Sequence, residues 1–331
     1  MSSLHVVIVN YRTGRLAVDC LQSLAPMVHD LHGGRVVVVD NDSGDDSVDL
    51  IRCAIAERCW SGWAELHALP RNGGFAYGNN AAIARVRELD PDFGAVLLLN
   101  PDTVASPGLF IHLAEGLRAN FGVGIVGAAI ENENGIAQCS AHRQPSPLTE
   151  LDSAAQLGPL SRWLAGSSPL PGVPSETAHE CDWVSGACMA VRREVLEAIG
   201  PMDEGFFLYF EEVDFCLRAR RAGWSCWFIP AARIRHFEGA STGIRVSRRR
   251  RPSYWYSSRR RFFVKAYGVA GLLAADLMWA FGRLSLVTRR ALRLGGRAGC
   301  DSEPTRYAFD LLGGDLRAIA NGELRRIRRF A

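Results

Sequence analysis

Four short apolar runs separated by helical patterns occupy the first hundred residues and constrain the fold more than any other feature. The runs are rich in β-branched residues and are Leu4–Val9, Arg35–Val39, Ala64–Leu69 and Ala95–Leu99. Strands that alternate with helices form βαβ units and hence a parallel sheet. Because runs that are apolar throughout suit strands buried on both faces, the sequence predicts an α/β domain with a mostly parallel sheet flanked by helices.

The alternation continues beyond residue 100, with one interruption. Between Arg143 and Glu180, six prolines fall within 38 residues, which predicts a loop or lid. The predicted division is a domain at residues 1–243, with the Pro-rich segment 143–180 inside it, and a helical region at residues 244–331. A further apolar run lies at Val123–Ile130, and a short strand is predicted around Ile136–His142. Regular structure resumes at Cys181–Val191, and a last strand is predicted at Trp224–Ile229, with helices from about Glu194 and over Glu211–Ala222.

Charge divides the chain at nearly the same place. Residues 1–240 carry 18 basic and 29 acidic side chains, whereas residues 241–331 carry 20 basic and 6 acidic ones. All basic residues except Lys265 are arginine, a planar and permanently charged donor. The two parts are therefore expected to meet different surroundings.

Composition excludes several classes of protein. A charged fraction of 22% with a hydrophobic fraction of 48% argues against disorder and against a polytopic membrane protein. Nine cysteines without a CxxC pair suit neither a disulfide framework nor a zinc ribbon, so a reducing compartment is predicted. The start of the chain lacks a signal-peptide pattern. Asp276 interrupts the best apolar stretch, Ala266–Gly282, which argues against a spanning helix and leaves an interfacial one open.

Polar clusters follow the four predicted strands where they end. In open α/β sheets the ligand crevice lies outside the carboxyl ends of the strands, so the clusters are expected to converge on one cleft. Asp40 suits ribose hydroxyls or a base edge, and Asp102 suits a divalent cation held against phosphate oxygens. The alternative is helix capping by the same side chains. The clusters are Asn10-Tyr11-Arg12, Asp40-Asn41-Asp42-Ser43, Arg71-Asn72-Gly73-Gly74 and Asn100-Pro101-Asp102.

Three carboxylates, Glu211, Glu212 and Asp214, follow the aromatic run 206–210. Apolar rings disfavour the charged form of a neighbouring carboxyl group, which raises its proton affinity toward that of a general base. The alternative is a helix N-terminus whose acidic residues complement the helix dipole. Both can hold, and we assign Glu212 to chemistry and Asp214 to capping or support.

His236 follows the last predicted strand. A lone histidine is more often structural than a ligand. Beside a metal-binding carboxylate it becomes a candidate to contact the cation or a diphosphate.

Taken in order, these segments resemble the family 2 glycosyltransferases with the GT-A fold, a Rossmann-like architecture, and in particular their bacterial rhamnosyltransferase-like branch. The resemblance covers about residues 4–243, and the shared order of the motifs makes it specific. The matching stretches are Val7–Tyr11, Val39–Ser43, Arg71–Ala76 with Gly78-Asn79-Asn80, Leu98–Asp102, Ser185-Gly186-Ala187 and Phe206–Arg218.

The resemblance implies an inverting transfer of a sugar from a nucleotide diphosphate donor to an acceptor hydroxyl. Asp40 would contact the nucleoside, and Glu212 would deprotonate the acceptor, a role open also to Glu211 and Asp214. Asp102 would bind Mg²⁺ or Mn²⁺, with His236 as a further ligand. The donor-binding residues implied are Asn10, Tyr11, Arg12, Asp40, Asn41, Ser43, Arg71, Asn72, Gly73, Asn79, Asn100 and Asp102, and the acceptor is expected near Trp183, Ser185, Gly186 and Ala187.

The chain departs from the family pattern at two positions. Asn100 is neutral where the metal motif usually has a second carboxylate, which bears on metal affinity. Glu212 stands where the base is typically aspartate, so its reach is longer by one methylene.

The basic C-terminal region places arginines beside aromatic and apolar residues. Arg248–Arg251 and Arg259–Arg261 flank Tyr254–Tyr256, and an apolar stretch follows. This pattern predicts a segment lying on an anionic membrane surface, where each arginine contributes about 1 kcal/mol. One alternative is a helical pair packed on the catalytic domain. The other is nucleic-acid binding, although nothing else in the chain resembles a nucleic-acid-binding module.

The predicted function is transfer of L-rhamnose from dTDP-rhamnose onto a lipid-linked or polysaccharide acceptor in envelope glycan assembly. The predicted location is the cytoplasm, peripheral at the inner face of the cytoplasmic membrane. The alternatives are a UDP- or GDP-linked donor, and a non-catalytic subunit that binds nucleotide sugars.

Overall fold

The computed structural model describes residues 3–165, 175–237, 249–292 and 304–328. The chain divides into two compact units, which we describe one at a time. Unit 1 comprises Met1–Arg143, Gly172–Phe207 and Glu211–Gly243, and unit 2 comprises Gln144–Pro171, Leu208–Phe210 and Ile244–Ala331.

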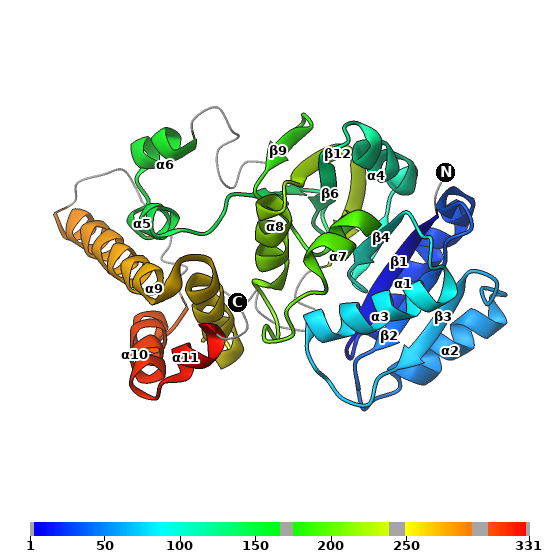
Figure 1. Ribbon diagram of the computed structural model, residues 1–331, viewed down its shortest axis with the longest axis horizontal. Helices are drawn as coiled ribbons and strands as arrows, with labels where there is room; N and C mark the ends of the chain where they lie inside the picture. Colours follow the sequence, from blue (N-terminus) through cyan, green and yellow to red (C-terminus); the bar gives the residue numbers. More distant parts are fainter. Residues whose placement is uncertain (1–2, 166–174, 238–248, 293–303, 329–331) are drawn as a thin grey trace. The chain divides into compact units, whose positions relative to one another are not determined.

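Unit 1 is built on one large sheet, in which the described residues contribute ten strands (Figure 1). Its main path runs β3-β2-β1-β4-β11-β6-β12-β5, and the first four strands are parallel neighbours. The strands are β1 (Leu4–Asn10), β2 (Val36–Asp40), β3 (Ala64–Ala68), β4 (Ala95–Leu99), β5 (Thr103–Ala105), β6 (Val123–Glu131), β7 (Ala137–Gln138), β9 (His179–Cys181), β11 (Cys188–Arg192) and β12 (Ser225–His236), and β8 (Ala141–His142) pairs separately with β10 (Trp183–Val184).

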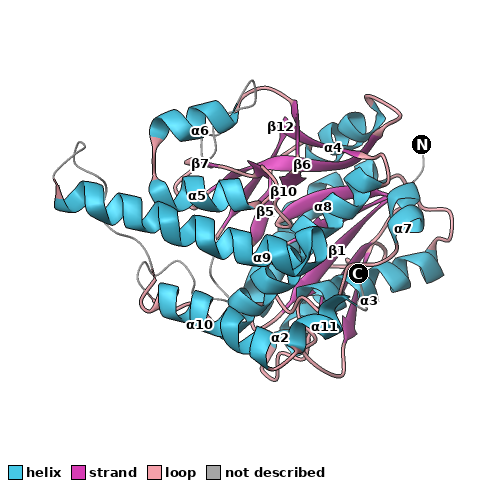
Figure 2. Cartoon of the chain, turned by 60° about the vertical axis from the view of Figure 1, so that its left-hand side comes forward, coloured by secondary structure: helices cyan, strands magenta, loops and turns pink. Residues whose placement is uncertain are grey.

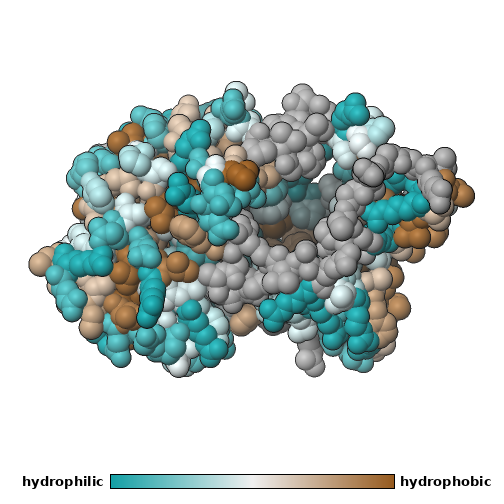
Figure 3. Space-filling model, turned by 180° about the vertical axis from the view of Figure 1, so that it is seen from behind, coloured by the Kyte–Doolittle hydropathy of each residue, from teal (hydrophilic) through white to brown (hydrophobic). Residues whose placement is uncertain are grey.

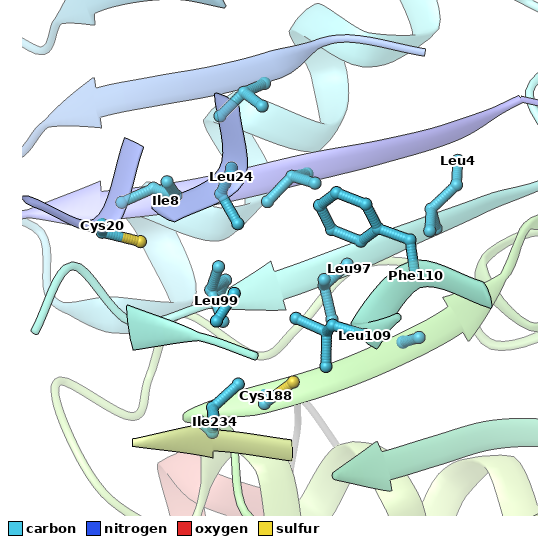
Figure 4. Close-up of a cluster of buried hydrophobic side chains, with 14 of the residues drawn as sticks. Leu4, Ile8, Cys20, Leu24, Leu97, Leu99, Leu109, Phe110, Cys188 and Ile234 are labelled. Carbon is cyan, nitrogen blue, oxygen red and sulfur yellow. The ribbon is translucent and has the colours of Figure 1, made fainter. Parts of the chain in front are cut away.

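Alternate side chains of the central strands enter two separate hydrophobic clusters. Val6 and Ile8 of β1 belong to one cluster, and Val7 and Val9 belong to the other. The side chains of a strand point alternately to its two faces, so the sheet is buried on both. Figure 2 shows helices on both sides of the strands, and Figure 4 shows side chains of the first cluster.

Each face has its own set of helices. The first cluster includes residues of α1 (Gly14–Leu24), α2 (Ser47–Glu57) and α4 (Leu109–Arg118), with the 3₁₀ segment Ala25–Leu31 beside them. The second includes residues of α3 (Phe75–Leu89), α7 (Arg193–Ile199) and α8 (Glu211–Arg221). The predicted α/β architecture with a mostly parallel sheet flanked by helices is thus confirmed.

Two strand predictions differ from the structure. The short strand predicted around Ile136–His142 is two strands, because β7 pairs with β6 and β8 pairs with β10. The stretch 181–191 contains the end of β9, which pairs with β12, then β10, and most of β11, which pairs with β4 and β6. The last strand is longer than predicted. A β-bulge between Ile229 and Arg233 lets β12 continue past Pro230, so His236 is its final residue.

Unit 2 is helical. It contains α5 (Pro147–Ala155), α6 (Gly158–Ala165), α9 (Ser253–Ala291), α10 (Tyr307–Ala320) and α11 (Glu323–Arg328). The prediction of a loop or lid is therefore wrong for the helical residues within 143–180. Pro147 occupies the first turn of α5, where proline is tolerated, and Ser146 and Thr149 form a capping box.

Helix α9 is two helical segments joined at Gly268, whose φ of 72° is not helical. By length and composition α9 is long and apolar enough to cross a membrane, with a third of its most apolar window buried. One side of it packs inside unit 2, where Trp279 meets Ala154, Tyr256 and Leu311. Another side is exposed and apolar, and includes Leu273, Leu277, Phe281, Leu284 and Val287.

A buried ion network holds the helices of unit 2 together. Arg259 of α9 is fully buried and contacts Glu150 (3.3 Å), Asp276 (2.9 Å) and Asp315 (3.4 Å). Arg260 pairs with Asp315 at 2.6 Å. Burial raises the pKa of Asp276 to about 7, and the positive charge of Arg259 opposes that shift. Part of the C-terminal arginine excess therefore serves packing rather than a solvated surface.

Removing a ring from the core of unit 1 should destabilise it far more than trimming the adjacent surface residue. Phe110 is fully buried, whereas Ile111 next to it is 44% exposed. We expect Phe110→Ala to lower the free energy of unfolding by about 3–5 kcal/mol, because it leaves a cavity. Ile111→Ala should cost less than about 1 kcal/mol. Urea unfolding followed by circular dichroism measures both, and equal losses would contradict the assigned core.

Candidate active site

The ends of β1 and β2 are joined by a buried polar network. Asn10 and Asp40 are register partners, and Asn10 Nδ2 donates to Asp40 Oδ1 at 2.8 Å. The backbone N–H of Ser43 donates to Asp40 Oδ2 at 3.0 Å. Both carboxylate oxygens are thus engaged within the loop itself. Because α2 begins only at Ser47, Asp40 does not cap that helix, and the capping alternative is wrong for it.

Arg12 fastens the loop after β1 to the loop after β2. Its backbone N–H donates to Ser43 Oγ (2.8 Å), and its Nε donates to the Ser43 carbonyl (2.9 Å). Its guanidinium also lies 5.2 Å from the centre of the Tyr11 ring. Arg12 and Asp42 both have a φ of 57°, which is uncommon for residues other than glycine and gives the two loops matching sharp turns.

The loop after β3 joins the same group through amide side chains. Asn41 Nδ2 donates to Asn72 Oδ1 (3.1 Å) and to the Gly74 carbonyl (3.0 Å). The backbone N–H groups of Gly73 and Gly74 donate to Asn41 Oδ1 (3.4 Å) and Asn72 Oδ1 (3.0 Å). The three predicted donor-binding clusters of β1, β2 and β3 are therefore brought together.

Gly74 allows this loop to lie close to the backbone of Phe207, a residue of the aromatic run 206–210. Its φ is 89°, and a Cβ there would lie 2.1 Å from the Phe207 carbonyl oxygen. The next residue, Phe75, donates its N–H to that oxygen at 2.9 Å. Only glycine fits this position.

Two further predicted donor-binding residues, Arg71 and Asn79, make local contacts in the structure. Arg71 lies 4.8 Å from the centre of the Tyr77 ring. Asn79 is buried and donates to the Phe75 carbonyl one helical turn earlier, at 2.9 Å. Asn79 thus supports the start of α3 rather than facing outward.

Asn100, Asp102 and His236 form a compact group at the end of β4. His236 Nε2 lies 3.1 Å from Asp102 Oδ1 and 3.3 Å from Asn100 Nδ2. Asn100 Oδ1 is buried and has no hydrogen-bond partner within the described residues. Because the chain continues from Asp102 directly into β5, whose Thr103 pairs with His236, the helix-capping alternative is wrong for Asp102.

This group has the donors of a partial metal site. Two ligands about 2.1 Å from one ion and at right angles to each other lie about 3 Å apart, as Asp102 Oδ1 and His236 Nε2 do. The described residues contain no group of three or more histidine, cysteine or acidic side chains suited to a metal. A cation here would need oxygens from a bound ligand or from water to complete its coordination.

The acidic residues after the aromatic run begin α8, and two of them carry buried, unsatisfied oxygens. Glu211 Oε2 and Glu212 Oε2 are both buried without a hydrogen-bond partner among the residues that the structure describes. Burial raises the pKa of Glu212 to about 7. Burial, followed by the neighbouring charge of Glu212, raises the pKa of Glu211 well above its ordinary value. All three acidic residues also lie in the first helical turn, as the dipole alternative expects.

Asp214 is engaged elsewhere. Arg218 Nε donates to Asp214 Oδ2 at 3.0 Å, and its two terminal nitrogens donate to the carbonyls of Ile199 (2.6 Å) and Pro201 (2.9 Å). This pair ties α8 to the end of α7. Sequence reasoning did not single out Arg218, although its spacing of four residues from Asp214 on a helix is a signal that points to the pair.

The turn at Gly186 links the acidic helix to the end of β4. A Cβ on Gly186 would lie 3.6 Å from Glu212 Cβ and 3.4 Å from the Phe75 ring. The adjacent Ala187 carbonyl accepts the N–H of Asn100 at 3.0 Å. Ser185 Oγ accepts the N–H of Ala187 at 3.3 Å and shapes the turn. Contacts within unit 1 thus run from Glu212 through the turn to the Asn100 group.

Trp183 flanks this turn and is held on two sides. Its ring stacks on His142 with centroids 4.2 Å apart, and its Nε1 donates to the Arg143 carbonyl at 2.7 Å. Burial lowers the pKa of His142 to about 4, so that ring is neutral near pH 7. The neutral pair forms a flat aromatic surface beside the turn.

Comparison with known proteins agrees with this arrangement. The chain matches the family described as "Glycosyltransferase like family 2" over residues 2–255. It is 30% identical over 219 residues to the N-acetylglucosaminyl-diphospho-decaprenol L-rhamnosyltransferase of Mycobacterium tuberculosis, covering 63% of this chain and 68% of that protein. It is 28% identical over 171 residues to a rhamnosyltransferase of Escherichia coli, covering 50% of this chain and 61% of that protein.

Solved structures show the same fold at low identity. A mannosyltransferase of Pyrobaculum calidifontis, in complex with GDP-Man and Mn²⁺, superposes with a TM-score of 0.56 at 15% identity over 96% of this chain and 81% of its own. The TarS protein of S. aureus with UDP-GlcNAc gives 0.55 at 16% identity, with the same coverages.

The site and fold therefore define a GT-A glycosyltransferase. The chain belongs to glycosyltransferase family 2, which confirms the resemblance to that family and its rhamnosyltransferase-like branch.

Removing the buried charge of Glu212 should stabilise the protein at high pH. The folded state raises the pKa of this group, so its contribution to stability is full below its unfolded pKa and is lost as the pH rises to about 7. We expect Glu212→Gln to be more stable than the wild type by roughly 1–3 kcal/mol at pH 8. The gain should vanish near pH 4, as measured by thermal unfolding across that range.

The exposed Glu194 on α7 provides the matched control. Glu194→Gln should follow the wild-type profile at every pH. A gain for Glu212→Gln that does not depend on pH would show that desolvation of this carboxylate is not its cause.

Proposed function

We propose that this glycosyltransferase moves L-rhamnose from dTDP-rhamnose onto the hydroxyl of a lipid-linked or polysaccharide acceptor, with inversion at the anomeric carbon. The observation that carries the proposal is the pair of buried, unsatisfied carboxylate oxygens on α8. Glu212 lies beside the turn at Gly186. The next residue of that turn, Ala187, accepts a hydrogen bond from the backbone of Asn100. A single displacement at the anomeric carbon needs a base on the side of the acceptor hydroxyl. It needs a group that binds the diphosphate on the opposite side.

The loops after β1, β2 and β3 are the proposed nucleoside site. Asp40 is fixed by Asn10 and Ser43, and this network sets the shape of the loop before any ligand enters. Tyr11, Arg12 and Asn72 border the same loops. A preorganised site loses little conformational freedom when the nucleotide binds.

Asp102 and His236 are the proposed protein ligands of Mg²⁺ or Mn²⁺. When bound, the cation would neutralise charge on the departing diphosphate. Asn100 is neutral, so Asp102 supplies the only carboxylate of this three-residue group, and His236 keeps that carboxylate oriented at 3.1 Å. The Mn²⁺ in the Pyrobaculum enzyme supports this assignment.

Glu212 is the proposed general base. As the acceptor oxygen bonds to the anomeric carbon, the acceptor proton passes to a Glu212 carboxylate oxygen. The bond from that carbon to the diphosphate breaks, and the nucleoside diphosphate leaves with the electron pair. A pKa of about 7 lets the group be a carboxylate in a large fraction of molecules near neutral pH and still hold the proton well.

The proposed identity of the donor sugar and of the acceptor is taken from the names of the relatives. Two of them are named rhamnosyltransferases, and the mycobacterial name specifies a diphospho-decaprenol acceptor. Two of the solved structures hold GDP-Man and UDP-GlcNAc, so a GDP- or UDP-linked sugar is the alternative donor. The remaining alternative is a non-catalytic subunit. Transfer activity in the wild-type protein that is lost in Glu212→Gln would exclude it.

The proposed location is the cytoplasmic face of the membrane. The exposed apolar side of α9 repeats at helical spacing through Leu273, Leu277, Phe281 and Leu284. Figure 3 shows hydrophobic residues on the surface of unit 2, to the right of the view. The other side of the helix packs inside unit 2, which suits a helix lying on the surface rather than spanning it. Of the arginines that prompted this prediction, Arg248 lies outside the described residues.

Replacing the proposed base should abolish transfer and leave donor binding intact. We expect Glu212→Gln to lower kcat by about 100-fold or more, because general-base catalysis supplies that much. Transfer from dTDP-rhamnose to a synthetic lipid-diphosphate N-acetylglucosamine, followed by chromatography, measures the rate. Calorimetry with dTDP should give an unchanged Kd.

Glu212→Asp is the matched control for that experiment. It restores a carboxylate at shorter reach, as in most of the family, and should retain much more activity than the glutamine variant. Unchanged turnover in Glu212→Gln would remove Glu212 from the role of base.

Removing the carboxylate of Asp102 should weaken donor binding only when a metal is present. We expect Asp102→Asn to weaken dTDP binding about tenfold in Mn²⁺, the size of one charge-assisted contact, and to leave binding in EDTA unchanged. Calorimetry under both conditions measures this. An equal loss in EDTA would mean that Asp102 acts on the nucleotide or the fold rather than through the cation.

A further inference from the structure

Unit 2 contains a cavity that the proposed reaction does not use. Its volume is about 480 Å³, and its walls include four arginines, Arg250, Arg251, Arg260 and Arg317. Among the described residues that line it, Asp310 is the only acidic one. Sites for small ligands commonly have volumes of about 300–1,000 Å³, so the cavity can hold one.

Contacts within unit 2 hold three of these guanidinium groups in place. Arg250 forms a bidentate pair with Asp310, with both N···O distances 2.7 Å. Arg260 is 8% exposed and its Nε donates to Asp315 at 2.6 Å. Arg251 lies over the Trp255 ring at 4.3 Å. Fixed guanidinium groups lose little entropy when they bind an oxyanion, which makes them suited to phosphate.

Hydrogen bonds among the described residues use the guanidinium groups of Arg251 and Arg260 only in part. Arg251 Nε is buried without a hydrogen-bond partner among the described residues. Arg260 is bonded through Nε, and its Nη2 lies beside Gly314, 3.2 Å from where a Cβ would be. The bare backbone of Gly314 therefore leaves room for this guanidinium in the wall.

The cavity also lies at the start of a long helix. Pro252, Ser253 and Tyr256 line it from the N-cap and first turn of α9, together with Ser257 just after them. Pro252 gives the helix no side-chain cap. N–H groups of a first turn have no partner within the helix, and the helix dipole there is positive. Both features add to the four arginines and favour an anion.

We propose that this cavity binds a phosphate monoester or diphosphate group. The wall has more arginine than acidic side chains, which favours an anionic ligand, and planar guanidinium groups match the geometry of phosphate oxygens. The ligand is either the headgroup of an anionic lipid or a free phosphate compound. Binding does not depend on sugar transfer, so this proposal and the proposed function fail independently.

Arg317→Gln tests the proposal in the full-length protein. Arg317 is exposed and lines the cavity, so its loss should not disturb folding. Arg306→Gln is the matched control, because Arg306 is an exposed arginine of the same unit that does not line the cavity. The probes are inorganic diphosphate, by calorimetry in EDTA, and phosphatidylcholine vesicles containing phosphatidic acid, by co-sedimentation.

We expect Arg317→Gln to bind about tenfold more weakly than Arg306→Gln, the size of one charge-assisted contact. Arg250→Gln should lose at least as much, because it also leaves Asp310 unpaired. Weaker binding of inorganic diphosphate identifies a free phosphate compound as the ligand, and weaker binding of vesicles alone identifies a lipid headgroup. Either result supports the proposed site.

Two results would overturn the proposal. One is binding by Arg317→Gln and Arg250→Gln that matches Arg306→Gln with both probes, while thermal unfolding shows all three variants to be folded. The other is an oligoribonucleotide that binds more tightly than either probe and loses affinity in Arg317→Gln, which would assign the cavity to nucleic acid.

Discussion

The parallel pairing of β1 with β2 and β4 is the constraint on which the candidate site depends. It places Asn10, Asp40 and Asn100 at the same edge of the sheet, since the carboxyl ends of parallel strands meet there. Burial on both faces fixes the register, because a slip of one residue would exchange the two hydrophobic clusters. The polar loops can then hold sharp turns, such as Arg12 and Asp42 at φ 57°, because the strands before them are buried and fixed in register.

The start of α8 and the two residues before it store unfavourable energy that their surroundings must offset. Glu211 is buried, and both it and the neighbouring, half-buried Glu212 carry one buried oxygen without a hydrogen-bond partner among the described residues. The two residues before them, Tyr209 and Phe210, adopt φ values of 71° and 68°, which are rare for aromatic residues. Strain and desolvation of this kind persist only where the surrounding structure overdetermines the conformation, and they cluster at functional sites. Arg218 supplies part of that support, because it anchors Asp214 in the same first turn.

The sequence predicted the elements whose signal is local and missed those set by distant partners. The β1, β2, β3 and β4 strands were predicted within one residue because apolar runs flanked by polar clusters carry the information. Helix α5 was missed because the prolines around it count as breakers, although Pro147 at a helix start is not one. The amide contacts of Asn41 with the loop after β3, and the ion network around Arg259, depend on packing that no spacing in the sequence reveals.

The arginine excess of the C-terminal region divides into three physical roles. Arg259 is fully buried and offsets carboxylates of three helices, so its charge is unavailable to any partner. Arg250, Arg251, Arg260 and Arg317 surround one cavity, where their charges act together on a ligand. Arg249 and Arg306 are exposed to solvent, where each adds only a weak, salt-sensitive attraction. Stable but reversible attachment to a membrane requires two signals, and an exposed apolar helix face with a phosphate-binding cavity in the same unit would provide both.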